Sequence, residues 1–385
     1  MTSELINRVR RFAETELLSK ENWFDSRPET PVPASSTLHA AGLANWWLPA
    51  EYGTAGASLT ESVDVVSALS YADAGFAFSS FLSVLGTTML RLFAEPVLAT
   101  EHLSRMARGG GFCGILASEE EAGSELGRIT TSYATVGGDL VLNGDKYFST
   151  NTDAADFLLV LARSAEDESN FGMVLLPRDT PGIEIAKRWD MIGMRGSATY
   201  QVRLTDCTVP AANLLRGNGL RNLEAGLNAS RILIASTAIG IARRVRDISM
   251  EYAAGKQVKG AALSSNAVFA GKLGQIEMHI DVMRNQCRSA AAEFDAVMAS
   301  NDPAGTFYRT GTIRSALAAK MFCGQAGWAV ATTGSEMFGG LGYTHDHLIG
   351  KLVRDLRYVG LVEGGDDVIR DLLYTRYVIP MARRL

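Results

Sequence analysis

The chain has 385 residues, a net charge of −5 and a pI of about 5.7. Apolar residues make up 47% of it and charged residues 21%, which is typical of a folded globular protein and excludes a disordered chain, a coiled-coil rod and a collagen-like repeat. At ~100–200 residues per domain, two or three domains are expected. The negative net charge argues against a nucleic-acid partner.

Several features predict a cytoplasmic protein without a membrane partner. No apolar run approaches the ~18–20 residues of a membrane-spanning helix, and runs such as 157–162 have the length of a strand. The first residues mix arginine with glutamate and lack the apolar core of a signal peptide. No CxxC pair is present, so a reducing compartment is expected. The four cysteines are isolated from one another, at Cys113, Cys207, Cys287 and Cys323.

Residues 1–112 are predicted to be helical. Leu5, Val9 and Phe12 recur at helical spacing and would face the core. The segment SLTE at 58–61 has the form of a capping box, which indicates a helix start. A further helix is expected from about Thr87 to Arg108, ending at the three glycines 109–111.

Residues 113–218 are predicted to form a β domain. Short β-rich runs are separated by Gly, Asp, Asn or Pro at intervals of 8–12 residues, as in an antiparallel barrel or sandwich. The expected strands are FCGILAS, SYATV, DLVLN, KYFST, FLLVLAR, GMVLLP, GIEIAK and YQVRLTD.

Residues 219–385 are predicted to form an antiparallel helical bundle. Apolar residues alternate there in steps of four and three over about six turns, which is typical of a bundle helix. The stripe consists of Phe269, Leu273, Ile276, Ile280, Met283, Cys287, Ala290, Phe294 and Val297.

Three short motifs contain residues that could carry chemistry. GGGFCG at 109–114 satisfies GxGxxG, but it follows a helix and opens a strand, so it indicates a helix end rather than a nucleotide loop. His345 and His347 lack a third ligand, and no metal site is predicted. Glu363 follows two apolar residues and precedes two glycines, so burial would raise its pKa toward that of a general base. Taken alone, this segment is better explained by an acid at a helix entry, with Asp366 and Asp367 beside it.

Four segments, in order, resemble motifs of the acyl-CoA dehydrogenase family. LASEEEAGSE at 116–125 resembles "TEPxAGSD", and LNGDKYFSTN at 142–151 resembles "LNGxKxWITN". GMRGS at 193–197 is followed by Val209-Pro210, and FGGLGY at 338–343 is followed by Arg354-Asp355 and Glu363-Gly364. The resemblance covers nearly the whole chain. It implies an α+β fold with an N-terminal helical domain (1–112), a middle antiparallel β-barrel domain (113–218) and a C-terminal four-helix bundle (219–385).

The resemblance implies oxidation of an acyl thioester with FAD. In this family a buried carboxylate removes a proton activated by the thioester carbonyl, while a hydride leaves the neighbouring carbon for the flavin. Glu363 matches that base. A minority branch places its base immediately before the arginine matching Arg231, but Ser230 stands there and cannot serve.

The resemblance also assigns binding residues. The implied flavin-binding residues are Leu116, Ser118, Phe148, Thr150, Lys256, Glu336, Gly339, Gly340, Gly365 and Asp367. The implied substrate-binding residues are Ser124, Asn228, Arg231 and Gly364.

The chain departs from the family pattern where the ADP end of FAD is expected. Lys256 replaces an arginine that reaches the FAD pyrophosphate of a neighbouring subunit, which keeps the charge and loses the bidentate fork. Ala267 and Glu336 each replace a glutamine, and Gly365 and Asp367 replace the Thr and Gln after the base. These changes imply either a specialised subfamily or a lost activity. The persistence of Glu363, Thr150 and Arg231 favours specialisation.

GLNASRILIAS, IGMRGSATYQV and VEGGDDVIRDL resemble dehydrogenases of polyketide extender-unit biosynthesis, in particular those of the allylmalonyl pathway of tacrolimus-type macrolides. This implies γ,δ-desaturation of a short 2-enoyl thioester held by coenzyme A or an acyl carrier protein. It also implies a homodimer or homotetramer and an electron-accepting flavoprotein as partner. Two alternatives stay open, namely an acyl oxidase on the same scaffold and a non-catalytic scaffold protein that has lost FAD.

Overall fold

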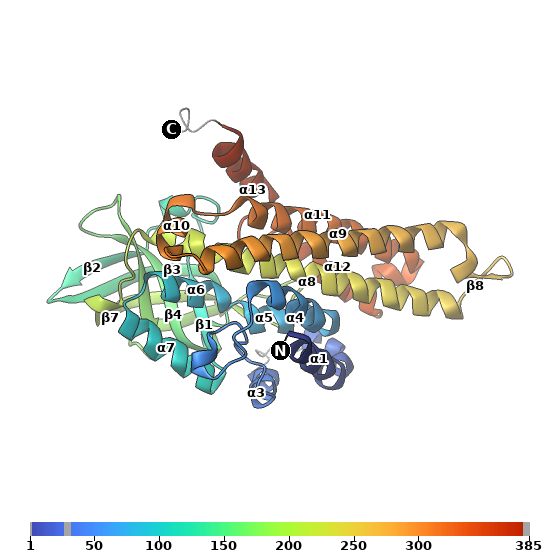
Figure 1. The fold of residues 1–385 in the computed structure, drawn as a ribbon, viewed down its shortest axis with the longest axis horizontal. Coiled ribbons are helices and arrows are strands. Elements are labelled where there is room, and N and C mark those ends of the chain that lie inside the picture. The colour runs from blue at the N-terminus through green and yellow to red at the C-terminus, as the bar shows by residue number, and fades with distance from the viewer. Residues whose placement is uncertain (1, 27–31, 380–385) are drawn as a thin grey trace.

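The computed structural model describes residues 2–26 and 32–379. Its N-terminal part is helical, as predicted (Figure 1). Leu5, Val9 and Phe12 are buried on the first helix. The helical segments are α1 (Thr2–Phe12), the π-helical η1 (Ala13–Leu17), the 3-10 turn η2 (Leu18–Lys20), α2 (Glu21–Ser26), α3 (Val32–Ala40), η3 (Ala50–Tyr52), α4 (Leu59–Ala72), α5 (Ala74–Phe81), α6 (Val84–Phe93) and α7 (Pro96–Gly109).

Local signals set several of these helix ends. The capping box is confirmed: the Glu61 amide donates to Ser58 Oγ (3.1 Å), and the Ser58 amide donates to Glu61 Oε2 (2.8 Å). α7 ends at Gly110, whose φ is +66°. The prediction of one continuous helix from Thr87 to Arg108 is wrong, because α6 ends at Phe93 and a second helix, α7, begins at Pro96. Pro96, which has no N–H to donate, takes the first position of α7.

The middle part forms a seven-stranded sheet. Its strand order is β1-β4-β2-β3-β7-β6, and β5 also pairs with β4. The strands expected at 139–143 and 146–150 join into β3. The strands are β1 (Phe112–Leu116), β2 (Ser132–Val136), β3 (Asp139–Thr150), β4 (Ala155–Ser164), β5 (Phe171–Pro177), β6 (Ile183–Arg188) and β7 (Thr199–Pro210), with 3-10 turns η4 (Leu126–Arg128), η5 (Thr152–Ala154) and η6 (Ala211–Asn213).

The sheet is not wholly antiparallel, which corrects the expected pattern. β1 and β2 each run parallel to β4, whereas the other pairs are antiparallel. The chain between β1 and β4 is long enough for the crossover that parallel neighbours need, since it contains the whole β2–β3 hairpin.

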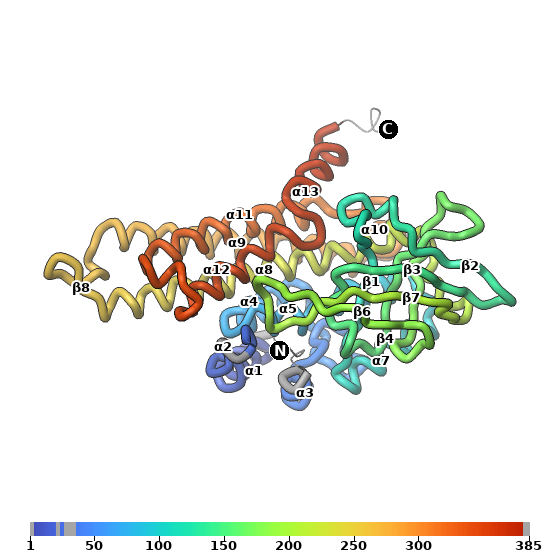
Figure 2. Tube along the Cα trace, turned by 180° about the vertical axis from the view of Figure 1, so that it is seen from behind, coloured from blue at the N-terminus to red at the C-terminus, as the bar shows by residue number. Residues whose placement is uncertain are grey.

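The C-terminal part is built on four long helices, α8, α9, α11 and α12, that run side by side (Figures 1 and 2). The predicted stripe of α9 is confirmed: it is buried apart from Leu273 and Val297, which are half-buried. The elements are α8 (Gly219–Gly255), β8 (Gln257–Val258), β9 (Ala261–Ala262), η7 (Leu263–Ser265), α9 (Ala267–Met298), α10 (Pro303–Thr310), α11 (Arg314–Met337), η8 (Gly339–Tyr343), α12 (Leu348–Val359), α13 (Asp366–Leu373) and η9 (Tyr374–Val378).

Two stretches have the length and hydropathy of a membrane span, contrary to the sequence expectation. They are Ala74–Phe93 and Gly219–Gly255, and 94% of the apolar window of each is buried inside the protein. Both therefore serve as core segments, and one core joins the N-terminal helices to the bundle.

A buried ion cluster joins all three parts of the chain. Lys351 of α12 contacts the carboxylates of Asp73 at 3.0 Å and Asp355 at 2.6 Å. Asp355 also accepts a hydrogen bond from the Met194 amide in the middle part (2.6 Å). The cluster fixes α12, and thereby the loop that carries Glu363.

Candidate active site

Glu363 lies in the short loop between α12 and α13. Its φ is +50° and that of Gly364 is +94°, so two successive residues adopt the left-handed conformation. That conformation is strained for a glutamate. Arg231 supports it, because its Nε donates to the Glu363 carbonyl oxygen at 2.9 Å.

The side chain of Glu363 points back to α8. Ser230 Oγ donates to Glu363 Oε2 at 2.6 Å. Burial raises the pKa of Glu363 to about 7, while the Ser230 hydrogen bond and the charges of Arg231 and Lys320 lower it. A carboxylate with a pKa near neutrality is suited to take a proton as a general base.

Three predicted substrate-binding residues surround this loop. Arg231 is buried and also donates from Nη1 to Thr312 Oγ1 (3.2 Å). A Cβ on Gly364 would lie 3.4 Å from Arg231 Nη2. The Asn228 amide is bound to main chain: its Oδ1 accepts from the Ile313 amide and its Nδ2 donates to the Gly311 carbonyl. Asn228 thus shapes the turn facing Arg231, and its contact with substrate stays a prediction.

A second group of predicted residues lies on β1, in the loop after β1 and on β3. Ser118 Oγ donates to the Tyr147 carbonyl (2.9 Å), and Thr150 and Thr199 share a hydrogen bond between their hydroxyls (2.9 Å). Phe148 has a φ of +55° and leaves 57% of its surface exposed. The Leu116 side chain is buried in the core of the sheet, so its main chain alone can face a ligand. Ser124 is exposed in the loop after β1.

The remaining predicted cofactor residues lie in two places. Gly365 and Asp367 flank the start of α13 beside Glu363, and Asp367 pairs with Arg370. By contrast, Lys256 follows the end of α8, Glu336 lies in the last turn of α11, and Gly339 and Gly340 follow α11, at the end of the bundle that carries β8 (Figure 1). Glu336 pairs there with Lys272 at 2.6 Å.

Residues 2–110, 114–207 and 217–378 match the family profiles described as acyl-CoA dehydrogenase N-terminal domain, middle domain and C-terminal domain. The chain belongs to the acyl-CoA dehydrogenase family. Probable acyl-CoA dehydrogenase YngJ of Bacillus subtilis (strain 168) is 28% identical over 369 residues, which cover 94% of each chain.

Solved structures share the fold of this dehydrogenase. Butyryl-CoA dehydrogenase from Megasphaera elsdenii matches with a TM-score of 0.88 and 23% identity, over 96% of both chains. The prolyl acyl carrier protein oxidase AnaB matches with a TM-score of 0.86 and 22% identity, over 97% of both chains. The predicted fold class is therefore confirmed, and the chain is an FAD-dependent acyl thioester dehydrogenase.

The side chains of the dehydrogenase fit a flavin. Phe148 presents an open aromatic face two residues before the Thr150 hydroxyl, and its ring stacks on Trp189 with centroids 5.0 Å apart. A Cβ at Gly339 or Gly340 would meet nothing within 4 Å, so a phosphate or ribose can approach the main chain there. These are the surfaces that an isoalloxazine ring and an ADP moiety require.

One ion pair in this region was missed from the sequence, although both partners stand in family motifs. Lys146 Nζ donates to Glu119 Oε1 and to the Ala117 carbonyl, each at 2.9 Å. Burial alone would raise the pKa of Glu119, but Lys146 and hydrogen bonds from Thr130 and Thr131 lower it to about 2. The pair holds the segment between Ser118 and Ser124 against β3. The motif spacing marks these residues, but it does not show that they meet.

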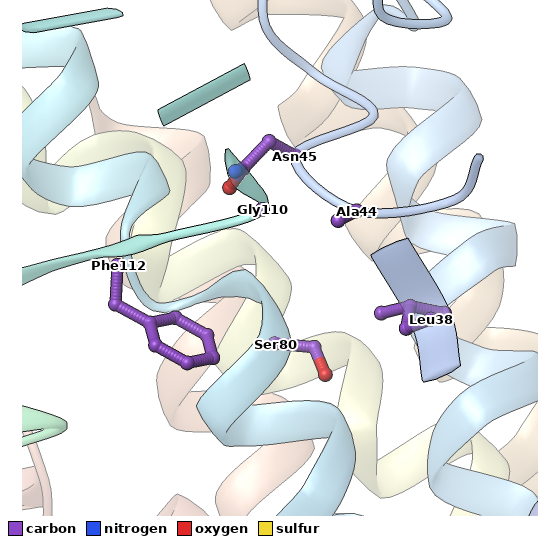
Figure 3. A pocket seen from close by; sticks show the side chains of 6 residues that line it. All are labelled: Leu38, Ala44, Asn45, Ser80, Gly110 and Phe112. Atoms are coloured by element: carbon purple, nitrogen blue, oxygen red, sulfur yellow. The ribbon is translucent and has the colours of Figure 1, made fainter. Parts of the chain in front are cut away.

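Two other features lie outside the site. A cavity of about 10 Å³, with room for at most one water molecule, is lined by none of the predicted site residues (Figure 3). Its lining is Leu38, Ala44, Asn45, Ser80, Gly110 and Phe112.

Within residues 2–26 and 32–379 no group of three potential metal ligands is found. His347 Nδ1 instead accepts a hydrogen bond from the Ile349 amide at the start of α12.

Proposed function

We propose that this acyl-CoA dehydrogenase desaturates a short acyl thioester with Glu363 as its base. The observation that carries the proposal is the partly buried Glu363, whose pKa is near 7, whose carboxylate is held by Ser230 and whose main-chain carbonyl is held by Arg231. FAD, when bound, supplies the acceptor for a hydride. The ionised Glu363 takes the proton from the activated carbon and becomes a neutral carboxylic acid, while Arg231 keeps its main chain in place.

For the substrate we propose a short 2-enoyl thioester that is desaturated at the γ,δ position in polyketide extender-unit formation. The resemblance of the three segments around Asn228, Met194 and Glu363 supports this assignment. AnaB, named a prolyl acyl carrier protein oxidase, has the same fold. This supports an acyl carrier protein, as an alternative to coenzyme A, as the group that carries the acyl chain. We further propose a homodimer or homotetramer that acts in the cytoplasm and passes electrons to a flavoprotein.

The test is an anaerobic titration of the purified yellow protein with 2-pentenoyl thioesters of coenzyme A and of a carrier protein. We expect the flavin absorbance to bleach and a pentadienoyl product to appear. Bleaching without a pentadienoyl species would contradict the γ,δ assignment. Peroxide formation in air would indicate the oxidase, and a colourless protein that does not take up FAD would indicate the scaffold protein.

Glu363→Gln tests the base directly. The amide cannot accept the substrate proton, so we expect the rate of bleaching to fall by roughly 10²–10⁴-fold with FAD retained. The matched control is Glu293→Gln, which removes an exposed carboxylate of α9 and should leave the rate unchanged. A Glu363→Gln enzyme with a near-normal rate would show that another group is the base.

A further inference from the structure

Lys320 is a fully buried cation beneath the Glu363 loop. It lies on α11 with 0% of its surface exposed, and its Nζ donates to the Gly364 carbonyl at 2.5 Å. Within the described part of the chain this ammonium group forms no ion pair within 4 Å, and the charges of Asp366 and Glu363 act on it from farther away. A buried ammonium group without a close counter-ion is costly, which calls for a role beyond packing.

Small residues bring α11 close enough for this contact. Gly324 lies one turn after Lys320, and a Cβ there would be 3.0 Å from the Gly360 Cα, at the start of the loop. Gly327 packs in the same way against Leu356 of α12. The approach places the Lys320 side chain directly under the main chain of Gly364.

The two left-handed residues of the loop are thus held by two different helices. Arg231 of α8 binds the Glu363 carbonyl, and Lys320 of α11 binds the next carbonyl in the chain. We propose that Lys320 is a positioning residue for the base, because its ammonium group holds the Gly364 carbonyl and thereby the left-handed loop that carries Glu363. The inference rests on the proposed role of Glu363.

Three charged groups act on Lys320, one on α8, one in the Glu363 loop and one at the start of α13. Burial and the Arg231 guanidinium group of α8 lower the pKa of Lys320 to about 8, while Asp366 at the start of α13 and Glu363 partly oppose them. A neutral amine donates a weaker hydrogen bond than an ammonium group. The hold on the loop should therefore weaken above about pH 8, just above the range in which Glu363 becomes ionised.

The pH profile of kcat tests this in the holoenzyme. We expect wild-type kcat to rise near pH 7 and to fall above about pH 8. Lys320→Arg keeps a cation that stays charged, so its alkaline fall should move up by at least one pH unit with kcat at pH 7.5 within about fivefold of wild type. Lys320→Met should lower kcat tenfold or more, with KM changed less than threefold. The proposal would be overturned if wild-type kcat did not fall above about pH 8, or if kcat of Lys320→Arg fell at the same pH as that of wild type.

Amide hydrogen exchange of residues 359–366 gives a readout that does not depend on turnover. After correction for intrinsic exchange, protection of this segment should drop above pH 8 in wild type and persist in Lys320→Arg. Lys320→Met, if it folds, should lack the protection at every pH. If wild type fails to bleach but shows this exchange pattern, the proposed function fails, while the hold of Lys320 on the loop stands. Equal protection in wild type and Lys320→Arg at pH 9 would overturn the role of Lys320.

Discussion

Ser230 shows how one hydroxyl sets the working range of the base. The residue stands where a minority branch of the family carries its own carboxylate, and here its Oγ donates to Glu363 at 2.6 Å. A hydrogen bond to the ionised form stabilises that form and lowers the pKa of the acid. Burial acts in the opposite direction and is the larger effect, which leaves the pKa near 7.

Ser230→Ala should therefore raise the pKa of Glu363. A hydrogen bond to an ionised carboxylate is stronger than one to the neutral acid by ~1 kcal/mol, which corresponds to about 0.5–1 pKa unit. The acid limb of the kcat profile should move to higher pH by that amount, because more of the base is protonated at any given pH. Ser230→Thr should restore the wild-type limb. The control is Ser236→Ala, which removes a buried hydroxyl of the same helix that binds only the Ile232 carbonyl. If the acid limb of the kcat profile does not shift in Ser230→Ala, the Ser230 hydroxyl does not set the pKa of the base.

At the scale of elements, local patterns predicted what depends on local contacts. The capping box of α4, the end of α7 at Gly110 and the buried stripe of α9 all follow from residues within a few turns of one another. The parallel pairing of β1 with β4 does not, because nothing in either strand records its partner. Lys320 left a weaker signal, a single charge in the apolar run LAAKMF, but the helix spacing alone does not show which carbonyl it meets.

The Glu119–Lys146 pair joins the loop after β1 to β3, as Lys320 joins α11 to the Glu363 loop. Removing the pair tests how far it stabilises the flavin side of the site. Lys146→Met leaves a buried carboxylate without its partner, so we expect a loss of about 3–5 kcal/mol in the free energy of unfolding. Arg203→Met, which breaks exposed ion pairs with Asp145 and Glu184 on the same sheet, should cost less than about 1 kcal/mol. Urea unfolding measures both, and equal losses would contradict the importance of the buried pair.

The same pair predicts an acid limit. The pKa of Glu119 is about 2 in the folded protein and about 4.5 in its ordinary state, so its contribution is fully present above pH 4.5 and is lost as the pH falls toward 2. In Glu119→Gln the unfolding free energy should be lower at pH 7, and its difference from wild type should shrink between pH 4.5 and 2. A difference that is constant with pH would contradict this assignment.

At the scale of the whole molecule, the predicted cofactor residues form two groups that lie far apart in one chain. Ser230 and Gly255 are 25 residues apart in the single helix α8, which is about 37 Å. Lys256, which follows α8, therefore lies at the end of the bundle away from the sheet (Figure 1), and Phe338, next to Gly339, contacts Tyr252 near that end. Since the family pattern places its counterpart of Lys256 on the pyrophosphate of a neighbouring subunit, we expect a second copy of the chain to supply this end.

Mixed dimers test that arrangement. Glu363→Gln and Lys256→Glu chains with different tags are expressed together, and the heterodimer is purified through both tags. If Lys256 serves the partner's flavin, one site of the heterodimer contains both native residues and the other contains both defects, so about half of the wild-type rate should return. Each variant homodimer should be nearly inactive, the first with FAD and the second with little FAD bound. If Lys256 instead serves its own chain, every site in the heterodimer carries one defect, and its rate should be no higher than that of the variant homodimers.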